Sequence, residues 1–114
     1  MINGGVIMAK KYQVINEFGV HNVYIEKNAY VSNDTLAIRL IGADDDYPYA
    51  TITVNIAESD LFASGNKAFV DTNNCPWAEK FLTDNKLAKP TGDIGESGWC
   101  KYPLYKFDLS KLEA

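Results

Sequence analysis

The stretch that decides the fold is YATITVNI, residues 49–56. Apolar and polar side chains alternate through it without a break, so that one face carries Ala50, Ile52, Val54 and Ile56 and the other carries Tyr49, Thr51, Thr53 and Asn55. A repeat of two is that of a β-strand, whose successive side chains point to opposite faces, and an α-helix cannot satisfy it. The pattern predicts one antiparallel strand with a buried face and a polar face.

Strand signals also precede and follow this stretch. Short segments rich in β-branched and aromatic residues are separated by turn residues at 12–16, 20–27 and 35–41, and again at 66–71 and 99–108. Consecutive strands joined by short turns form a meander. Pro103 places the last strand at a sheet edge or a bulge, because proline cannot donate a hydrogen bond to a neighbouring strand.

The repeat changes to a helical one after residues 73–76, Asn-Asn-Cys-Pro. Asparagine is a favoured N-cap, proline is tolerated in the first helical turn, and apolar residues recur at helical spacing from Trp77 to Leu82. We therefore expect one helix at about residues 75–87, followed by a flexible glycine-bearing loop at 90–98. The predicted fold is α+β: an antiparallel sheet, a meander of about four to six strands, with one α-helix packed on one face. We expect residues 1–10 to be a flexible N-terminal lead-in and residues 11–114 to form a single α+β domain.

Composition excludes several kinds of site. The 114 residues include 11 Lys+Arg and 15 Asp+Glu, a net charge of −4, with one histidine, two cysteines and one arginine. His-rich zinc sites, four-thiolate sites and arginine-rich nucleic-acid patches cannot be assembled from this set, so we expect no metal and no cofactor. Without a secretory signal, Cys75 and Cys100 are expected to be free thiols in the cytoplasm. No run approaches the ~20 apolar residues of a membrane helix.

A turn that is both acidic and aromatic is the best candidate for a contact site. Three consecutive acids are followed by two tyrosines within residues 44–49. The spacing is not that of a calcium-binding loop, and it is typical of a turn between strands. Tyrosine is enriched at protein interfaces, and a negative patch complements a basic partner. The predicted contact residues are this turn and the polar face of residues 49–56, namely Asp44, Asp45, Asp46, Tyr47, Tyr49, Thr51, Thr53 and Asn55.

Two other functions are weighed against this one. Cys75 at a helix N-terminus could act as a nucleophile or redox thiol with His21 as its base, but the sequence offers no third group to orient the pair. Exposed aromatic residues could stack nucleic-acid bases, but the same faces carry Glu26 and neutral polar residues where cations are needed. Direct nucleic-acid binding is therefore not expected. A homo-oligomer formed through the strand edge near Pro103 stays open.

Residues 20–108 resemble a family of small bacterial, phage or conjugative-element proteins catalogued only as a domain of unknown function. The resemblance is carried by YATITVNI (49–56), NKAFVDTNN (66–74) and KPTG (89–92). It supplies no catalytic residues. It implies an accessory protein of a mobile genetic element, a class in which small acidic proteins bind and block a host defence protein such as a nuclease of a CRISPR or restriction system. The expected function is thus a cytoplasmic, non-enzymatic protein-binding module with anti-defence activity.

Overall fold

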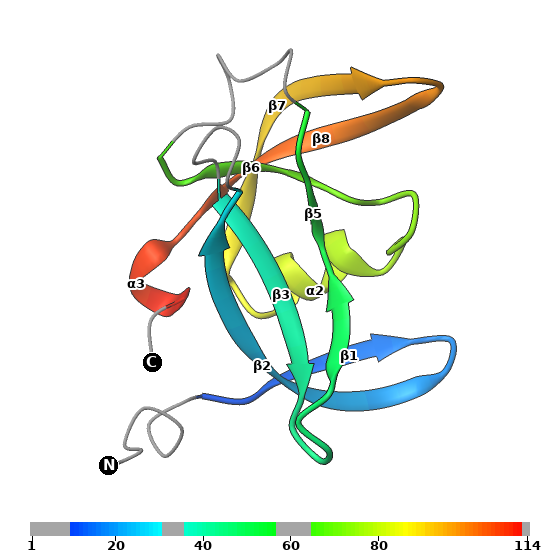
Figure 1. Cartoon of the computed structure of the whole chain (residues 1–114), viewed down its shortest axis with the longest axis vertical. Helices are drawn as coiled ribbons and strands as arrows, with labels where there is room; N and C mark the ends of the chain where they lie inside the picture. The colour runs from blue at the N-terminus through cyan, green and yellow to red at the C-terminus, as the bar shows by residue number, and fades with distance from the viewer. Residues whose placement is uncertain (1–9, 31–35, 57–64, 113–114) are drawn as a thin grey trace.

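The computed structural model describes residues 10–30, 36–56 and 65–112 and shows mostly antiparallel β structure with two short helices in that part of the chain. Its strands form two sheets of four (Figure 1). Residues 1–9 of the expected lead-in lie outside the described residues, as do residues 31–35, 57–64 and 113–114.

The first sheet is the predicted meander. Its order is β1-β2-β3-β4, and every neighbouring pair is antiparallel. Its strands are β1 (Tyr12–Asn16), β2 (Gly19–Ala29), β3 (Leu36–Gly42) and β4 (Pro48–Thr51). On β1, Tyr12 and Val14 are buried while Gln13 and Ile15 are exposed, so one face of this hairpin packs on the core and the other faces solvent.

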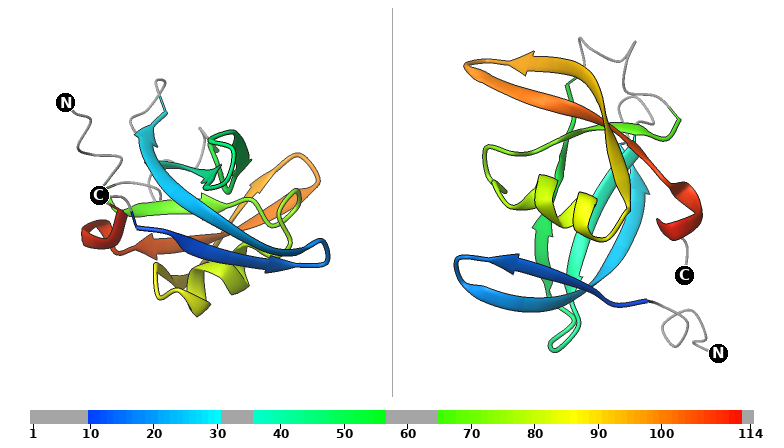
Figure 2. Two further views of the ribbon diagram at one scale, coloured as in Figure 1. Left: turned by 90° about the horizontal axis from the view of Figure 1, so that it is seen from below. Right: turned by 180° about the vertical axis from the view of Figure 1, so that it is seen from behind.

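The prediction of a single sheet was wrong, because the remaining strands form a second one. Its order is β5-β6-β8-β7, again with antiparallel neighbours. Its strands are β5 (Thr53–Val54), β6 (Lys67–Val70), β7 (Ala88–Ser97) and β8 (Cys100–Phe107). The views in Figure 2 show the two sheets crossing, with helix α2 (Ala78–Asp84) beside both.

Ile52 is the point at which the chain passes from one sheet to the other. Its amide donates to the carbonyl of Ile38 on β3 at 3.0 Å, and its own carbonyl accepts the amide of Asp71, just after β6, at 2.8 Å. Residues 49–56 are therefore divided between β4 and β5 and do not form the single strand that their alternation predicts. Both Ile52 (0% exposed) and Thr53 (3%) are buried, because this stretch is covered on both faces where the sheets meet.

Thr53 consequently leaves the predicted polar face. Its hydroxyl oxygen accepts the amide of Ile38 at 3.1 Å and lies 3.0 Å from the hydroxyl of Tyr30. The Tyr30 hydroxyl also donates to the Thr53 carbonyl at 3.1 Å. A buried polar group must find partners within the protein, and Thr53 finds them across the junction between the sheets.

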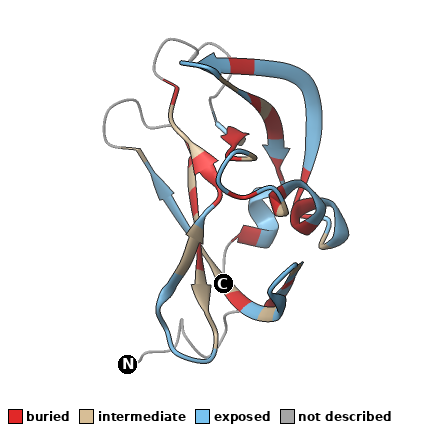
Figure 3. Ribbon diagram, turned by 90° about the vertical axis from the view of Figure 1, so that its right-hand side faces the viewer, coloured by how far each residue is buried: buried red, intermediate tan, exposed pale blue. Residues whose placement is uncertain are grey.

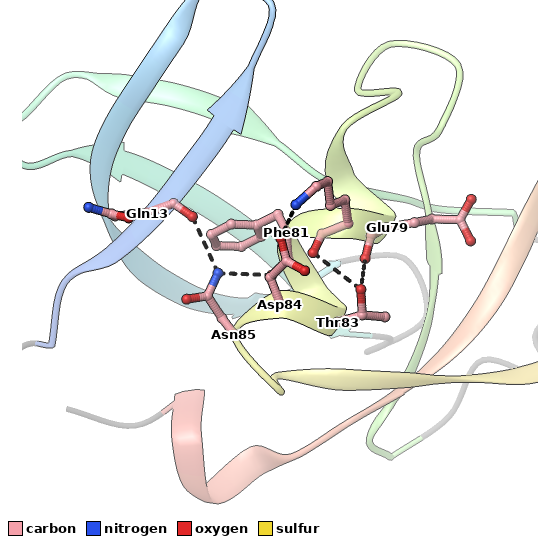
Figure 4. Close-up of polar contacts among 7 residues, drawn as sticks. Gln13, Glu79, Phe81, Thr83, Asp84 and Asn85 are labelled. Carbon is pink, nitrogen blue, oxygen red and sulfur yellow. Dashed lines mark hydrogen bonds and ion pairs between the residues drawn. The ribbon is translucent and has the colours of Figure 1, made fainter.

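Helix α2 is shorter than predicted and contacts both sheets. It begins at Ala78, after the N-cap residue Trp77, because Asn74 donates to the carboxylate of Asp71 (3.1 and 2.9 Å) and does not cap the helix. At its other end the side chain of Asn85 donates to the carbonyls of Phe81 (2.9 Å) and of Gln13 on β1 (3.3 Å), as Figure 4 shows.

The second sheet holds α2 through Tyr105 of β8, whose hydroxyl donates to Glu79 at 2.6 Å. A second helix that the sequence did not predict, α3 (Leu109–Leu112), follows β8. The main core lies between the sheets and α2 and includes Val14, Leu40, Leu82 and Phe107. Figure 3 shows buried segments, in red, on strands and on helical turns that face one another.

The glycine-bearing segment, predicted to be a flexible loop, is strand β7. Its pairing with β8 shifts register between Pro90 and Ile94, a β-bulge. A Cβ on Gly95 would lie 2.5 Å from the ring of Phe69, so only glycine fits there. The bulge and the close approach to Phe69 both favour turn-type residues such as glycine, so the sequence resembles that of a loop although the segment is a paired strand.

Strand β8 is central in its sheet, so the edge position predicted from Pro103 is wrong for the strand as a whole, whereas the alternative prediction of a bulge is confirmed because the β7–β8 register shifts beside Pro103. Pairing between β6 and β8 starts at Leu104, so Pro103 is paired with β7 alone. Proline has no amide hydrogen to donate, and at position 103 there is no paired β6 residue to accept one.

Candidate functional site

The three predicted acids lie in the turn between β3 and β4, which hydrogen bonds hold in one shape. The amide of Gly42 donates to the carbonyl of Tyr47 at 2.8 Å, and the amide of Asp46 donates to the carbonyl of Gly42 at 2.9 Å. The carboxylate of Asp45 accepts the amide of Tyr47 at 3.1 Å. Asp44, Asp46 and Tyr47 are left projecting into solvent, and Tyr47 is 71% exposed.

The turn between β1 and β2 carries exposed apolar side chains that sequence reasoning did not select. Phe18 is 78% exposed at its tip. Ile15 and Val20, directly paired across the two strands, are both exposed on the outer face of the hairpin. Asn16 holds this turn, because its side chain accepts the amide of Phe18 (2.9 Å) and donates to the hydroxyl of Tyr49 (2.8 Å).

These two turns both belong to the first sheet; in Figure 1 the β1–β2 turn extends to the right and the β3–β4 turn points to the bottom. Strand β3 ends opposite Val23 of β2, and the amide of Ala43 donates to the carbonyl of Asn22 at 2.9 Å, so the β3–β4 turn follows β2 toward its own turn. Val20 is two residues, about 7 Å, further along β2. We call this region the hairpin-tip surface and define it as Ile15, Phe18, Val20, Asp44, Asp46 and Tyr47.

Tyr49 supports this surface from beneath. Its ring packs against the main core and against two neighbouring rings, those of His21 (5.1 Å between centroids) and Trp77 (5.7 Å). Trp77 in turn meets Phe81 of α2 at 6.4 Å. The hydroxyl of Tyr49 accepts the hydrogen bond from Asn16, so Tyr49 links the core to the β1–β2 turn.

The other residues of the predicted contact set are separated from the acidic turn. Thr51 is exposed opposite Arg39 on β3, Thr53 is buried, and Asn55 is half-buried beyond β5 in the second sheet. Because the chain changes sheets at Ile52, the polar face of residues 49–56 does not continue the surface of the acidic turn. The structure therefore brings together Asp44, Asp46 and Tyr47, and leaves the threonines and Asn55 apart from them.

Cys75 is not placed as a nucleophile would be. It is 5% exposed, lies three residues before α2, and its Sγ is 3.8 Å from the carbonyl of Thr51. Burial, reinforced by the negative charge of Asp71, raises the pKa of the Cys75 thiol to about 11. No hydrogen bond joins Cys75 to His21, whose ring packs on Tyr49.

Other features of the described residues bear on the remaining expectations. Both cysteines are free thiols, as predicted. Within residues 10–30, 36–56 and 65–112, no three or more His, Cys, Asp or Glu side chains are grouped so that they could hold a metal ion. No helix in that part of the chain has the length and apolar character needed to cross a bilayer.

The apolar half of the hairpin-tip surface could have been found from the sequence by a turn argument. Residues 14 and 15 are both apolar, so alternation alone does not say which of the two is buried. Phe18 is the second residue of the two-residue turn between β1 and β2, just before Gly19. A side chain at the tip of a hairpin cannot reach the core. The large apolar residue at a turn was therefore the available signal.

Comparison with known proteins gives one match. No curated protein and no solved structure matches the chain. A family model matches residues 24–114, a range that starts within β2 and includes the whole of the second sheet. This match confirms the resemblance found in the sequence: the chain belongs to the family described as Domain of unknown function (DUF4313).

Proposed function

We propose that this protein is a non-enzymatic protein-binding module whose hairpin-tip surface contacts the partner. The observation that carries the proposal is the exposure of four apolar or aromatic side chains, Ile15, Phe18, Val20 and Tyr47, each at least half exposed. Large apolar side chains gathered on a surface are typical of protein interaction sites. Aromatic residues of this kind supply much of the binding energy at interfaces.

The turns are restrained before any partner arrives, and this favours binding. Asn16 fixes the β1–β2 turn through Phe18 and Tyr49, and Asp45 fixes the β3–β4 turn through Tyr47. A surface that is ordered in advance loses less conformational entropy when it binds. The restraints therefore increase the affinity available from a small apolar contact.

Charge indicates the kind of partner. The apolar side chains are flanked by the exposed carboxylates of Asp44 and Asp46, with Glu17 exposed in the neighbouring turn. A complementary surface would have an apolar pocket within a basic rim, as the nucleic-acid groove of an enzyme provides. Together with the family resemblance, this supports a cytoplasmic role in a mobile genetic element, with a host defence nuclease as the partner and inhibition as the outcome.

The alternative of a thiol enzyme has weaker support. Because its pKa is raised to about 11, the Cys75 thiol is protonated at pH 7. Thiolate is the nucleophilic form, and among the described residues no base lies in hydrogen-bond contact with the sulfur. Protein binding is therefore better supported than thiol catalysis.

The test is affinity capture from the native host with the full chain and matched variants. Phe18→Ser removes the apolar anchor, and Asp44→Ser with Asp46→Asn removes two charges while keeping the turn bond of Asp45. Asparagine tolerates the positive φ of 59° at position 46. Trp99→Ser is the control, because Trp99 is fully exposed on the β7–β8 hairpin, outside this surface.

The expected result is a partner that the wild type and Trp99→Ser both capture and that Phe18→Ser loses. For the charge variant we expect weaker capture and a shallower dependence on salt. If the partner survives Phe18→Ser and is lost with Trp99→Ser, the contact lies on the other hairpin and the proposal is wrong. A second copy of the chain as the captured species would instead indicate a homo-oligomer, which sedimentation at two concentrations identifies.

A further inference from the structure

Three lysines stand in a row across the second sheet. In the register of the strands, Lys67 of β6 is opposite Lys106 of β8, and Lys106 is opposite Lys89 of β7. Directly opposed residues project from the same face of a sheet, and neighbouring strands are about 4.8 Å apart. The lysine row therefore places three ammonium groups on one face, within about 10 Å measured along the sheet.

Elsewhere the sheets pair unlike charges across strands. Glu26 of β2 is opposite Arg39 of β3, and the two form an ion pair at 2.6 Å. Glu96 of β7 is opposite Lys101 of β8. Like charges placed directly opposite one another destabilise a sheet. The lysine row is thus a local departure from the rule that the rest of the molecule follows, and such departures are typical of functional sites.

Beside the row is a cleft of about 840 Å³ between the start of β7, the end of β8 and α3. Lys89 and Lys106 line it, and Lys86 and Lys111 add two more lysines to its walls. The ammonium of Lys111 donates to the carbonyl of Lys86 at 2.9 Å, which fixes one side of the opening. We call this region, together with Lys67, the lysine cleft.

Within the described residues the positive charge of the lysine cleft is compensated only in part, by Asp108 near Lys111. None of the three lysines of the row forms an ion pair there. Asp108 is the one carboxylate among the described lining residues, and it accepts hydrogen bonds from the amide (3.1 Å) and hydroxyl (2.6 Å) of Ser110. Five lysines face one occupied carboxylate in a chain whose net charge is −4.

We propose that the lysine cleft is a binding site for the phosphate backbone of duplex nucleic acid. This proposal is independent of the hairpin-tip surface, because α3 and the β1–β2 turn lie on opposite sides of the molecule (Figures 1 and 2). It also departs from the sequence-based expectation, because the five lysines are scattered between residues 67 and 111 and only the fold gathers them.

The chemistry of the lysine cleft favours a duplex over a single strand. Phe107 is the only aromatic side chain among the described lining residues, and it is 1% exposed, so no ring is available to stack on bases. The cations are lysines, which act as point charges toward phosphate, and arginine, the usual reader of guanine, does not line the cleft in the described part. We therefore expect binding without sequence preference.

Charge density favours nucleic acid over an acidic protein. Each strand of a duplex carries one negative charge per about 3.4 Å of the axis, so one strand presents roughly three charges over the length of about 10 Å spanned by the row. An extended acidic peptide presents one side chain per two residues on a given face, about one per 7 Å, and so offers one or two charges over the same length. Of the two, the duplex supplies enough charge for the three lysines of the row.

The test uses the full chain and a fluorescently labelled duplex of roughly 20 base pairs, with binding followed by anisotropy between about 50 and 200 mM salt. For three to five phosphate contacts, we expect log K to fall with log salt with a slope of about −3 to −4.5. Lys106→Gln should make the slope shallower by about 0.9, and Lys89→Gln with Lys106→Gln by about 1.8. These variants relieve repulsion within the row, so we expect them to keep the fold.

Lys101→Gln is the matched control, because Lys101 lies on the same strand, opposite Glu96, and the substitution changes the net charge equally. It should leave the slope unchanged. Equal slopes for Lys106→Gln and Lys101→Gln would show that only net charge matters and would overturn the site. Absence of binding at about 50 mM salt, or tighter binding per charge to polyglutamate or to inorganic triphosphate than to the duplex, would overturn the assignment to duplex nucleic acid.

Discussion

The two sheets differ in what they expose. The first pairs its charges, as Glu26 does with Arg39, and presents apolar side chains at its turns, with Phe18 as the most exposed of them. The second hides its large apolar residues except on the β7–β8 hairpin, and places Lys67, Lys106 and Lys89 side by side. Both sheets expose apolar side chains at a hairpin, Phe18 in the first and Trp99 in the second, but only the second places like charges opposite one another. The difference teaches that an even overall composition can conceal two chemically opposite faces.

Breaking the junction between the sheets should have the largest effect on stability. Thr53→Val keeps the side-chain volume but removes the acceptor for the buried amide of Ile38 and the partner of the Tyr30 hydroxyl. An unsatisfied buried group of this kind costs about 1–3 kcal/mol, so we expect the free energy of unfolding to fall by about 2 kcal/mol. Thr51→Val, at an exposed position of the same stretch, should change it by less than about 0.5 kcal/mol. Urea unfolding measures both, and equal effects would contradict the buried role of Thr53.

Loosening the β1–β2 turn should have a smaller effect, confined to the first sheet. Asn16→Ala removes the acceptor for the amide of Phe18 and the donor to Tyr49. We expect a loss of about 1 kcal/mol of stability and faster hydrogen exchange at the Phe18 amide, with no change in exchange on β8. Exchange that rises equally in both sheets would show that Asn16 does not act locally.

Changing one charge in the second sheet should give effects of opposite sign at two positions. Lys106→Glu places a carboxylate between Lys67 and Lys89 and should raise the free energy of unfolding by about 0.5 kcal/mol. Lys101→Glu, opposite Glu96, should lower it by a similar amount. Thermal and urea unfolding at low salt check both changes. If Lys106→Glu destabilises the protein as much as Lys101→Glu does, the lysine row carries no repulsion.

Alkaline pH should reveal the smallest effect, which is absent near neutrality. The ordinary pKa of the thiol, 9.0, is raised to about 11 for Cys75 in the folded protein by burial and by Asp71. Between these values the folded state binds more protons than the unfolded state, so stability falls as pH rises through this window and is unaffected below it. Burial and the hydrogen bond to Glu79 also raise the pKa of Tyr105, which adds to the loss above pH 10.

Unfolding measured in urea from neutral to alkaline pH tests this prediction. Cys75→Ala should reduce the loss of unfolding free energy at alkaline pH. The part of the loss that comes from Tyr105 should remain. Iodoacetamide provides a second measurement, since a protonated, buried Cys75 should react more slowly at pH 8 than Cys100, which is half-buried. Faster reaction at Cys75 would favour the thiol-enzyme alternative.

The elements that could be predicted from the sequence are those governed by local periodicity. Alternation located β1, β2, β3 and β6 to within a few residues, and the helical spacing after Pro76 located α2. The division of residues 49–56 between two sheets could not be predicted, because it depends on hydrogen bonds that join distant segments: the Ile52 amide donates to Ile38, and the Asp71 amide donates to Ile52. Strand β7 was missed because glycines at a bulge and against Phe69 have the same composition as a loop.

The candidate sites show the same limit. The acidic turn was predictable, because three acids and Tyr47 are contiguous in the chain. The contribution of Phe18 depends on the pairing of β1 with β2, and the lysine row depends on the order of β6, β8 and β7. The net charge of the whole chain averages over these faces. A site made by strand register is therefore invisible to composition.

The most direct test of the hairpin-tip surface is site-specific photocrosslinking in the native host. A benzophenone amino acid replaces Phe18 in one version of the full chain and Trp99 in another, since both positions are highly exposed on hairpin tips. We predict that the version at position 18 forms a crosslinked protein adduct and that the version at position 99 does not form it. A partner crosslinked from position 99 and absent from position 18 would contradict the assignment of the contact surface to the first sheet.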